Sequence, residues 1–238
     1  GWGFDAAVLQ PLADALGGEC QVQVAALPRL ASASAGDWLD ELDARLADGC
    51  WLAGWSLGGM LAAALAARRG ARCRGLITLA SNACFVASEH WPQALAEDTY
   101  SAFYLGCQAN AGATLKRFAM LCAQGAADAR GLSRQLQAHL LAGDEAALLA
   151  GLRVLASLDN RAPLAAFGGA QLTQLIARQY GFSAEEAESK KRSGDLPPEY
   201  ASGVLKPFVA SIAQEIARAL QFFFTSTPYN RVDYVLLA

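Results

Sequence analysis

The sequence predicts an α/β protein with a helical insertion, followed by a second segment of different composition. Short apolar runs alternate with helical patterns between residues 20 and 80, as in a parallel sheet whose strands are joined by right-handed crossovers. The chain is rich in Ala, Leu and Gly up to about residue 166, whereas charged helical segments and an aromatic run follow from residue 168. This change of composition indicates a domain boundary, so we expect domains at 1–166 and 168–238.

The alternation in the first domain predicts three strands and two helices. They are a strand at 20–26, a helix at 37–47, a strand at 50–54, a helix at 57–69 and a strand at 74–80. Only helical patterns follow, at 94–160, where Ala/Leu stripes are broken by glycines. Those helices indicate an insertion or lid over the sheet, spanning about residues 85–160.

Composition excludes several classes of function. The net charge of −3 argues against a nucleic-acid partner, and no window reaches eighteen uninterrupted apolar residues, so no membrane span is expected. The first residue is Gly1 and no signal-peptide pattern follows, which favours a partial or processed chain. Six cysteines fit no metal-binding spacing. We expect them to be buried, reduced thiols of a cytoplasmic protein, with no metal and no cofactor.

The clearest chemical signal is Gly54-Trp55-Ser56-Leu57-Gly58, which has the spacing G-x-S-x-G between a predicted strand and a predicted helix. That context is the one a serine nucleophile requires, because the glycines permit a tight turn that exposes the serine. The helix beyond it offers backbone N–H groups to a developing oxyanion. The alternative interpretation is a turn of small residues that only packs.

Four segments make a family resemblance specific: "GWGFDAAVLQPLADAL", "WLAGWSLGGMLAAALAAR", "GLITLASNACFVASEHWP" and "GLRVLASLDNRAPL". Over residues 1–166 the chain resembles the pimeloyl-acyl-carrier-protein methyl ester esterases of biotin synthesis. The resemblance implies a partial α/β-hydrolase sheet with a helical lid, and an ester substrate carried on acyl carrier protein. It implies that Ser56 is the nucleophile and that backbone N–H groups of Trp2 and Leu57 form the oxyanion hole. Phe118 matches an aromatic residue near the acyl chain, although ordinary lid packing explains it equally well.

The rest of that family's catalytic triad has no match here. The family order is serine, aspartate, histidine, but no strand with the aspartate follows the lid and no histidine follows His139. His90 lies at the entry to the lid and His139 in a lid helix, so neither matches the base. The family's strand that precedes the Gly-Trp segment would also lie before Gly1. We therefore expect an incomplete sheet and little ordinary turnover within these 238 residues.

Residues 168–238 resemble a different family, the actin-like ATPase of type IV pilus assembly. The matching segments are "GGAQLTQLIARQYGFSAEEAESKKRSGDLPPEY" and "VLKPFVASIAQEIARALQFFFTSTPYNRVDYVLLA". The resemblance implies a fragment of an actin-like α/β domain with inner-membrane pilus proteins as partners. No phosphate-binding loop is present, so no nucleotide-binding residue is assigned.

Four features of this tail are expected from the residues themselves. A helix carries the stripe Leu172, Leu175 and Ile176, and Ser183 with Glu186 forms a capping box for the next helix. A long amphipathic helix is expected at 203–224 and a buried strand at 232–238. We expect the aromatic run Phe222, Phe223 and Phe224 to pack in a core rather than to form a surface for a partner protein.

Three functional hypotheses remain open from the sequence. The first is a serine carboxylesterase that lacks its triad partners. The second is a non-catalytic interaction fragment of pilus assembly, carried by the tail. The third is a chimeric or truncated reading frame with no evolved function, because two unrelated partial resemblances meet near residues 166–169.

Overall fold

The computed structural model describes residues 1–141 and 143–214. The chain divides into two compact units, Gly1–Pro163 and Leu164–Ala238. The division lies in the first turn of helix α8, which spans Arg161–Tyr180.

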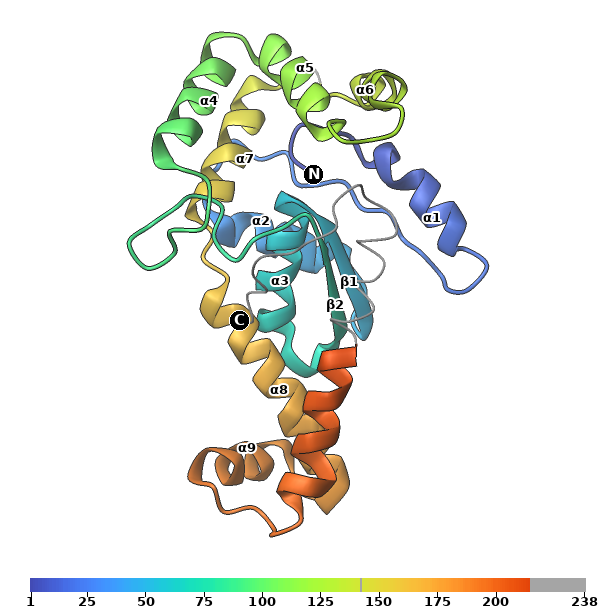
Figure 1. The fold of residues 1–238 in the computed structure, drawn as a ribbon, viewed down its shortest axis with the longest axis vertical. Helices are drawn as coiled ribbons and strands as arrows, with labels where there is room; N and C mark the ends of the chain where they lie inside the picture. The colour runs from blue at the N-terminus through green and yellow to red at the C-terminus, as the bar shows by residue number, and fades with distance from the viewer. Residues whose placement is uncertain (142, 215–238) are drawn as a thin grey trace. The chain divides into compact units, whose positions relative to one another are not determined.

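A two-stranded parallel sheet and one covering helix form the centre of the first unit. Strands β1 (Cys50–Trp55) and β2 (Cys73–Leu79) pair in register, so that Trp55 lies opposite Leu79. Helix α3 (Leu57–Arg69) connects them as a crossover and packs on the sheet (Figure 1). Its small and aliphatic side chains are almost all buried, which is why this sequence sits against a sheet. The predicted strands at 50–54 and 74–80 and the helix at 57–69 are confirmed to within one residue.

The predicted strand at 20–26 is wrong. Residues 21–30 have no regular secondary structure, and Val22 is exposed. A strand needs a neighbour to receive its backbone hydrogen bonds, and among the described segments β1 pairs only with β2. The carbonyl of Ala26 instead accepts a hydrogen bond from the Arg45 side chain at 3.0 Å. The alternation of side chains therefore predicted a strand, but no described strand lies beside these residues to form backbone hydrogen bonds with them.

Helices make up the rest of the first unit. The predicted helix at 37–47 is confirmed two residues earlier, as α2 (Ala35–Arg45) with Ser34 as its N-cap. After β2 the described residues form no further strand, and 94–160 is mainly helical as predicted, with isolated β-bridges at Leu95, Leu140 and Asp159. The remaining elements are η1 (Ala6–Leu9), α1 (Gln10–Leu16), η2 (Gly70–Arg72), α4 (Glu97–Ala109), α5 (Ala111–Cys122), α6 (Ala129–Ala138) and α7 (Glu145–Ser157).

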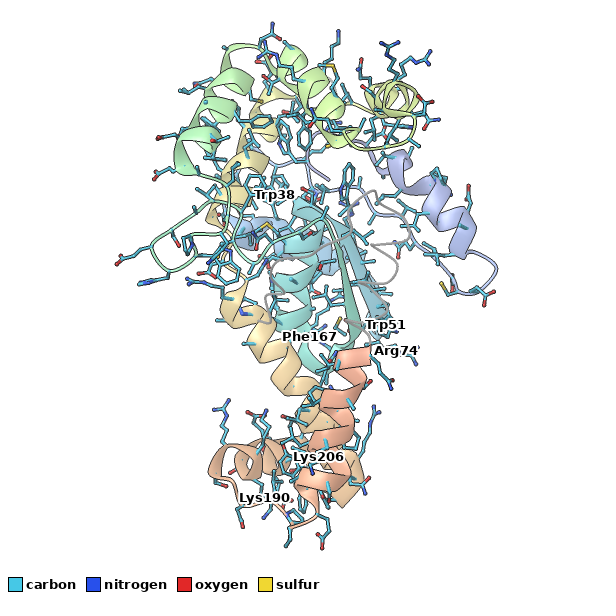
Figure 2. All side chains as sticks on the ribbon, in the orientation of Figure 1. Trp38, Trp51, Arg74, Phe167, Lys190 and Lys206 are labelled. Carbon is cyan, nitrogen blue, oxygen red and sulfur yellow. The ribbon has the colours of Figure 1, made fainter. Side chains whose placement is uncertain are left out.

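Helices α4 to α7 lie beyond the carboxyl ends of the two strands (Figure 1). Side chains of α5 and α6 pack around Phe4 and reach Trp55, the last residue of β1. Trp38 of α2 is 2% exposed, and its ring approaches Gly151 of α7 so closely that a Cβ there would lie 3.1 Å from it (Figure 2). The first unit therefore has a continuous core that joins the helices to the sheet.

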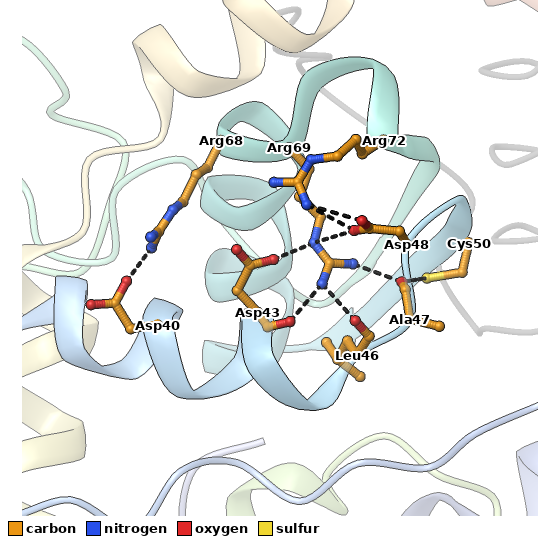
Figure 3. A network of polar contacts seen from close by, with 9 residues as sticks. All are labelled: Asp40, Asp43, Leu46, Ala47, Asp48, Cys50, Arg68, Arg69 and Arg72. Atoms are coloured by element: carbon orange, nitrogen blue, oxygen red, sulfur yellow. Dashed lines mark hydrogen bonds and ion pairs between the residues drawn. The ribbon is translucent and has the colours of Figure 1, made fainter.

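Arg69 ties the ends of α2 and α3 together (Figure 3). Its guanidinium has no exposed surface and donates to the Asp43 carboxylate at 2.6 Å. It also donates to backbone carbonyls of α2 and the following turn, those of Asp43, Leu46 and Ala47. The last carbonyls of a helix have no intrahelical donor, so Arg69 caps α2 from the end of α3. This arginine lowers the pKa of Asp43 by a hydrogen bond to its carboxylate.

The second unit is a small helical cluster in its described part. It contains most of α8, α9 (Ala184–Ser193), a π-helix (Ala201–Leu205) and a helix at 206–214. Ile176, Ala187 and Val204 form its buried centre. The Ser183 hydroxyl accepts the Glu186 N–H at 3.1 Å, which confirms the predicted cap, and Gly194 ends α9 with φ +76°.

The described part of this unit differs from one expectation and agrees with another. Leu175 was expected on the buried stripe of its helix, but it is 39% exposed, whereas Leu172 and Ile176, one turn apart, face the core. The predicted helix at 203–224 is helical over its described residues up to 214. Its end, Phe222–Phe224 and the expected strand at 232–238 lie outside the described residues.

Candidate functional site

Ser56 occupies a sharp turn between β1 and α3. Its backbone has φ +53° and ψ −123°, a conformation that L-residues rarely adopt and that persists only when surrounding contacts impose it. The Ser56 carbonyl accepts the N–H groups of Gly59 at 2.8 Å and Met60 at 3.1 Å, which begins α3. The strand–serine–helix order expected from the sequence is therefore present with the strained serine that the spacing predicts.

The glycines around Ser56 differ in how strictly the structure requires them. A Cβ on Gly54 would lie 2.2 Å from the carbonyl oxygen of Gly58, which is backbone and cannot swing away. A Cβ on Gly58 would meet nothing closer than a Leu27 methyl at 3.7 Å, an ordinary contact. Gly59, which is outside the five-residue motif, would place a Cβ 2.0 Å from the Ser81 hydroxyl oxygen. The close approaches therefore require glycine at 54 and 59, rather than at both glycines of the motif.

Ser56 lines a cavity of about 460 Å³ at the carboxyl ends of the two strands. Its wall combines aliphatic and aromatic side chains with neutral polar ones, the composition expected of a small-molecule site. The lining residues are Ser56, Met60, Ala80, Ser81, Asn82, Phe85, Gln93, Ala94, Leu95 and Leu155. None of these residues carries a carboxylate, an imidazole or a cation.

Trp2 and Leu57, the two residues expected to form the oxyanion hole, are both buried. Gly1, which precedes Trp2, lies against the ring of Trp55 at the end of β1, where a Cβ on Gly1 would be 3.0 Å away. The Trp2 indole donates to the carbonyl of Leu148 at 2.8 Å, so the side chain is committed to packing against α7. Leu57 is the first residue of α3, where a backbone N–H has no intrahelical acceptor. Their predicted role in an oxyanion hole stays a prediction.

Phe118 belongs to an aromatic cluster on α4, α5 and the N-terminal segment. Its ring centroid lies 5.6 Å from Trp2, 5.8 Å from Phe4 and 5.9 Å from Phe103. Such edge and tilted contacts stabilise packing by about 0.5–1.5 kcal/mol per pair beyond burial. Phe118 does not line the Ser56 cavity, so its predicted contact with an acyl chain stays a prediction.

Neither histidine lines the Ser56 cavity. His139 ends α6, and its Nδ1 lies 3.2 Å from the Asp5 carboxylate, while its carbonyl accepts the Asp5 N–H at 2.9 Å. The carbonyl of His90 accepts a hydrogen bond from Arg161 at 3.4 Å. Asp159 is also engaged elsewhere, because Arg161 binds it at 2.6 Å and holds its pKa well below the usual range. The described residues thus bring no acid–base partner to Ser56.

Other site types find no support in residues 1–141 and 143–214. This part of the chain contains no group of three or more potential metal ligands. The six cysteines are all unpaired, and Cys73, Cys84 and Cys107 are buried, whereas Cys20 is exposed and departs from the expected burial. Within the same residues, no helix is long and apolar enough to cross a membrane.

Sequence reasoning missed the polar residues after β2. Ser81 donates its hydroxyl to the Ser56 carbonyl at 2.8 Å, and Asn82 and Gln93 complete the polar part of the cavity wall. The signal was present in "LASNACF", because polar residues that directly follow a parallel strand lie at the same edge as the serine turn.

Comparison with known proteins gives similarities to two families. A sequence profile of the type IV pilus assembly protein PilM matches residues 163–238. The pimeloyl-[acyl-carrier protein] methyl ester esterase of Aeromonas hydrophila is 37% identical over 172 residues, covering 68% of this chain and 67% of that protein. The esterase of Aeromonas salmonicida is 31% identical over 247 residues, covering 99% and 91%.

A bifunctional relative shows a longer context for the same region. The biotin biosynthesis bifunctional protein BioHC of Cellvibrio japonicus is 37% identical over 185 residues. That alignment covers 75% of this chain and 37% of the bifunctional protein, so the chain spans well under half of that relative's length.

Proposed function

The chain belongs to the family of pimeloyl-[acyl-carrier protein] methyl ester esterases, and on this premise we propose that Ser56 is the nucleophile of a carboxylic ester hydrolase. The observation that carries the proposal is the strained Ser56 turn, which joins β1 to α3 and lines a cavity of about 460 Å³. In the proposed reaction the Ser56 hydroxyl attacks the ester carbonyl carbon and the alcohol leaves. Water then releases the acid and regenerates the serine.

Backbone groups would stabilise the charge that forms on the carbonyl oxygen. We assign this role to the N–H groups of Trp2 and Leu57, since Leu57 begins α3 and a helix N-terminus favours negative charge. Removing one such donor typically costs about 10²–10³ in kcat, because it acts where charge develops. A backbone N–H cannot be removed by side-chain substitution, so the roles of Trp2 and Leu57 are tested only indirectly, through substitution of Ser56.

The proposed reaction also requires a proton acceptor for the Ser56 hydroxyl. A serine hydroxyl needs a base to attack an ester efficiently, and a positioned acid or base contributes about 10²–10⁴-fold. Neither His90 nor His139 lines the cavity, and among the described residues no carboxylate does. We therefore propose that these 238 residues hydrolyse esters in a Ser56-dependent manner but far below the rate of a complete triad.

The substrate class we propose is an ester carried on an acyl carrier protein, as the relatives' name states for them. Four exposed cations on α5 and α6 support this. Lys116, Arg117, Arg130 and Arg134 make no ion pair with any described residue. A carrier protein with an acidic surface would be attracted to these cations. Helix α5 also carries Phe118, which packs in the same cluster as Trp55, the residue before Ser56.

Hydrolysis of p-nitrophenyl butyrate tests the proposed nucleophile. The parent chain, Ser56→Ala and Ser101→Ala are compared, where Ser101 is an exposed serine on α4 and serves as the matched control. We expect Ser56→Ala to remove the protein-dependent rate and Ser101→Ala to retain it. Equal rates for the parent and Ser56→Ala would exclude Ser56 as the nucleophile.

A second function is favoured by the PilM match over residues 163–238. We propose that this segment binds inner-membrane proteins of type IV pilus assembly. A pull-down of the full chain with those proteins tests it. Because Val209 and Ile212 are exposed one turn apart on the helix at 206–214, Val209→Asp should weaken capture. Absence of capture by the parent chain would count against this function.

The join between the two similarities defines a third possibility, a chimeric reading frame. The PilM profile begins at residue 163, next to the division at Pro163 and Leu164, whereas the esterase of Aeromonas salmonicida aligns with 99% of the chain. One continuous genomic read across the codons for 160–170 tests it, and an intact in-frame junction at normal depth would exclude a join made during assembly.

A further inference from the structure

Ser56 and Ala80 are the two non-glycine residues of the described chain that adopt positive φ, at +53° and +48°. They directly follow Trp55 and Leu79, which are register partners at the ends of neighbouring parallel strands. Both residues also line the same cavity. Two rare backbone conformations at one strand edge indicate that the segment after β2 is shaped around the serine turn.

The end of β2 binds both backbone polar groups of Ser56. The Ser56 N–H donates to the Leu79 carbonyl at 2.9 Å, and the Ser56 carbonyl accepts the Ser81 hydroxyl at 2.8 Å. The Ser81 oxygen also lies 3.2 Å from the Leu79 carbonyl, but a hydroxyl has one proton. The shorter and more favourable distance assigns that proton to Ser56.

The Ser81 hydroxyl fits this position because residue 59 is glycine. A Cβ on Gly59 would lie 2.0 Å from the Ser81 oxygen and 3.0 Å from its Cβ. The hydroxyl therefore occupies space that α3 leaves open beside the serine turn. Glycine at residue 59 therefore lets the Ser81 hydroxyl come within 2.8 Å of the Ser56 carbonyl, so this hydrogen bond depends on the close approach of α3 to the segment after β2.

We propose that Ser81 is a positioning residue for Ser56, whose hydroxyl bond to the Ser56 carbonyl helps to hold the nucleophile turn in its strained conformation. Helix α3 alone would satisfy the Ser56 carbonyl through Gly59 and Met60. The Ser81 hydroxyl adds a hydrogen bond from the segment that follows β2. Together with the Leu79 carbonyl, it holds both the N–H and the carbonyl of Ser56. The catalytic meaning of this role rests on the proposed function, whereas the geometric role does not.

Backbone amide exchange at Ser56, measured by NMR on the full chain, tests the proposal without requiring any activity. In Ser81→Ala, exchange at the Ser56 amide should rise about tenfold, because loss of one hydrogen bond makes local opening easier. Exchange at Leu65, in the core of α3, should change by less than twofold and serves as the reference amide. Ser81→Thr, which keeps the hydroxyl, should restore protection at Ser56.

A merely structural role for Ser81 would raise exchange at Ser56 and Leu65 equally, and that result would overturn the proposal. So would an unchanged Ser56 amide in Ser81→Ala. If Ser81→Ala does not fold, Ser81→Cys gives a second test, because it keeps a side chain at this position but replaces the hydroxyl with a larger and much weaker donor. Ester hydrolysis is measured separately, by comparing the parent chain with Ser56→Ala. If that comparison shows no Ser56-dependent activity, the exchange result still tests the geometric role of Ser81.

Discussion

The two glycines of Gly54-Trp55-Ser56-Leu57-Gly58 should respond oppositely to substitution by alanine. In Gly54→Ala, the new Cβ would lie 2.2 Å from the Gly58 carbonyl oxygen, 2.3 Å from its carbon and 2.5 Å from the Gly59 nitrogen. All three atoms are backbone, so the serine turn itself must move. Overpacking in a core costs about 1–3 kcal/mol, and a rigid backbone neighbour favours the upper end.

Gly58→Ala meets no such obstacle. Its Cβ would have an ordinary 3.7 Å contact with Leu27, and Gly58 lies in the first turn of α3. Alanine in a helix is more favourable than glycine by about 0.5–1 kcal/mol, because glycine loses more backbone freedom on folding. The structure therefore predicts that Gly58→Ala is neutral or stabilising, although it breaks the motif spacing.

Tryptophan fluorescence during thermal unfolding measures both effects in the first unit alone, because all five tryptophans precede residue 164. For a unit of this size, about 3 kcal/mol lowers Tm by about 6–12 °C, which we expect for Gly54→Ala. Gly58→Ala should shift Tm by about 0 to +4 °C. Equal destabilisation by the two substitutions, or an unchanged Tm in Gly54→Ala, would refute this account of the turn.

Two other substitutions test contacts away from the cavity. Arg69→Met leaves Asp43 without its partner and leaves three carbonyls at the end of α2 without a donor. The free energy of unfolding of the first unit, measured in urea, should therefore fall by about 3–5 kcal/mol. Substitution of the exposed Arg74 by Met is the control and should change this free energy little. Lys191, then Thr173 and Arg192, hold the pKa of Glu188 at about 2, below its ordinary 4.5. The ionised Glu188 stabilises the fold fully above pH 4.5, and this stabilisation is lost as the pH falls toward 2. Glu188→Gln lacks it at every pH, so its urea midpoint, followed by circular dichroism, should fall less on acidification than that of the exposed control Glu185→Gln.

Local patterns predicted the elements that carry the serine. β1, the Ser56 turn, α3 and β2 follow from one contiguous stretch of sequence, because strand and helix periodicities change at the motif glycines. The expected strand at 20–26 failed because strand pairing depends on a partner elsewhere in the chain. Its alternation of side chains contains no information about whether such a neighbour exists.

The close contacts at the site could not be read from the sequence. Gly59 faces Ser81 across 22 positions of chain, and only the crossover brings β2 beside β1 and creates their contact. In the sequence Arg69 is one of two adjacent arginines with nothing to distinguish them, yet its guanidinium is fully buried as the cap of α2. In both cases the residue type was visible, but its partner depended on tertiary packing.

Chemical rescue with imidazole tests the central claim most directly, which is that Ser56 is an ester nucleophile that finds no base among residues 1–141 and 143–214. Imidazole can accept the serine proton from solution, and the rate it adds is measured with p-nitrophenyl butyrate for the parent and Ser56→Ala at equal imidazole concentrations. We predict that imidazole increases the parent rate beyond its effect on Ser56→Ala, in proportion to protein concentration. Identical imidazole-dependent rates for the two proteins would contradict the account.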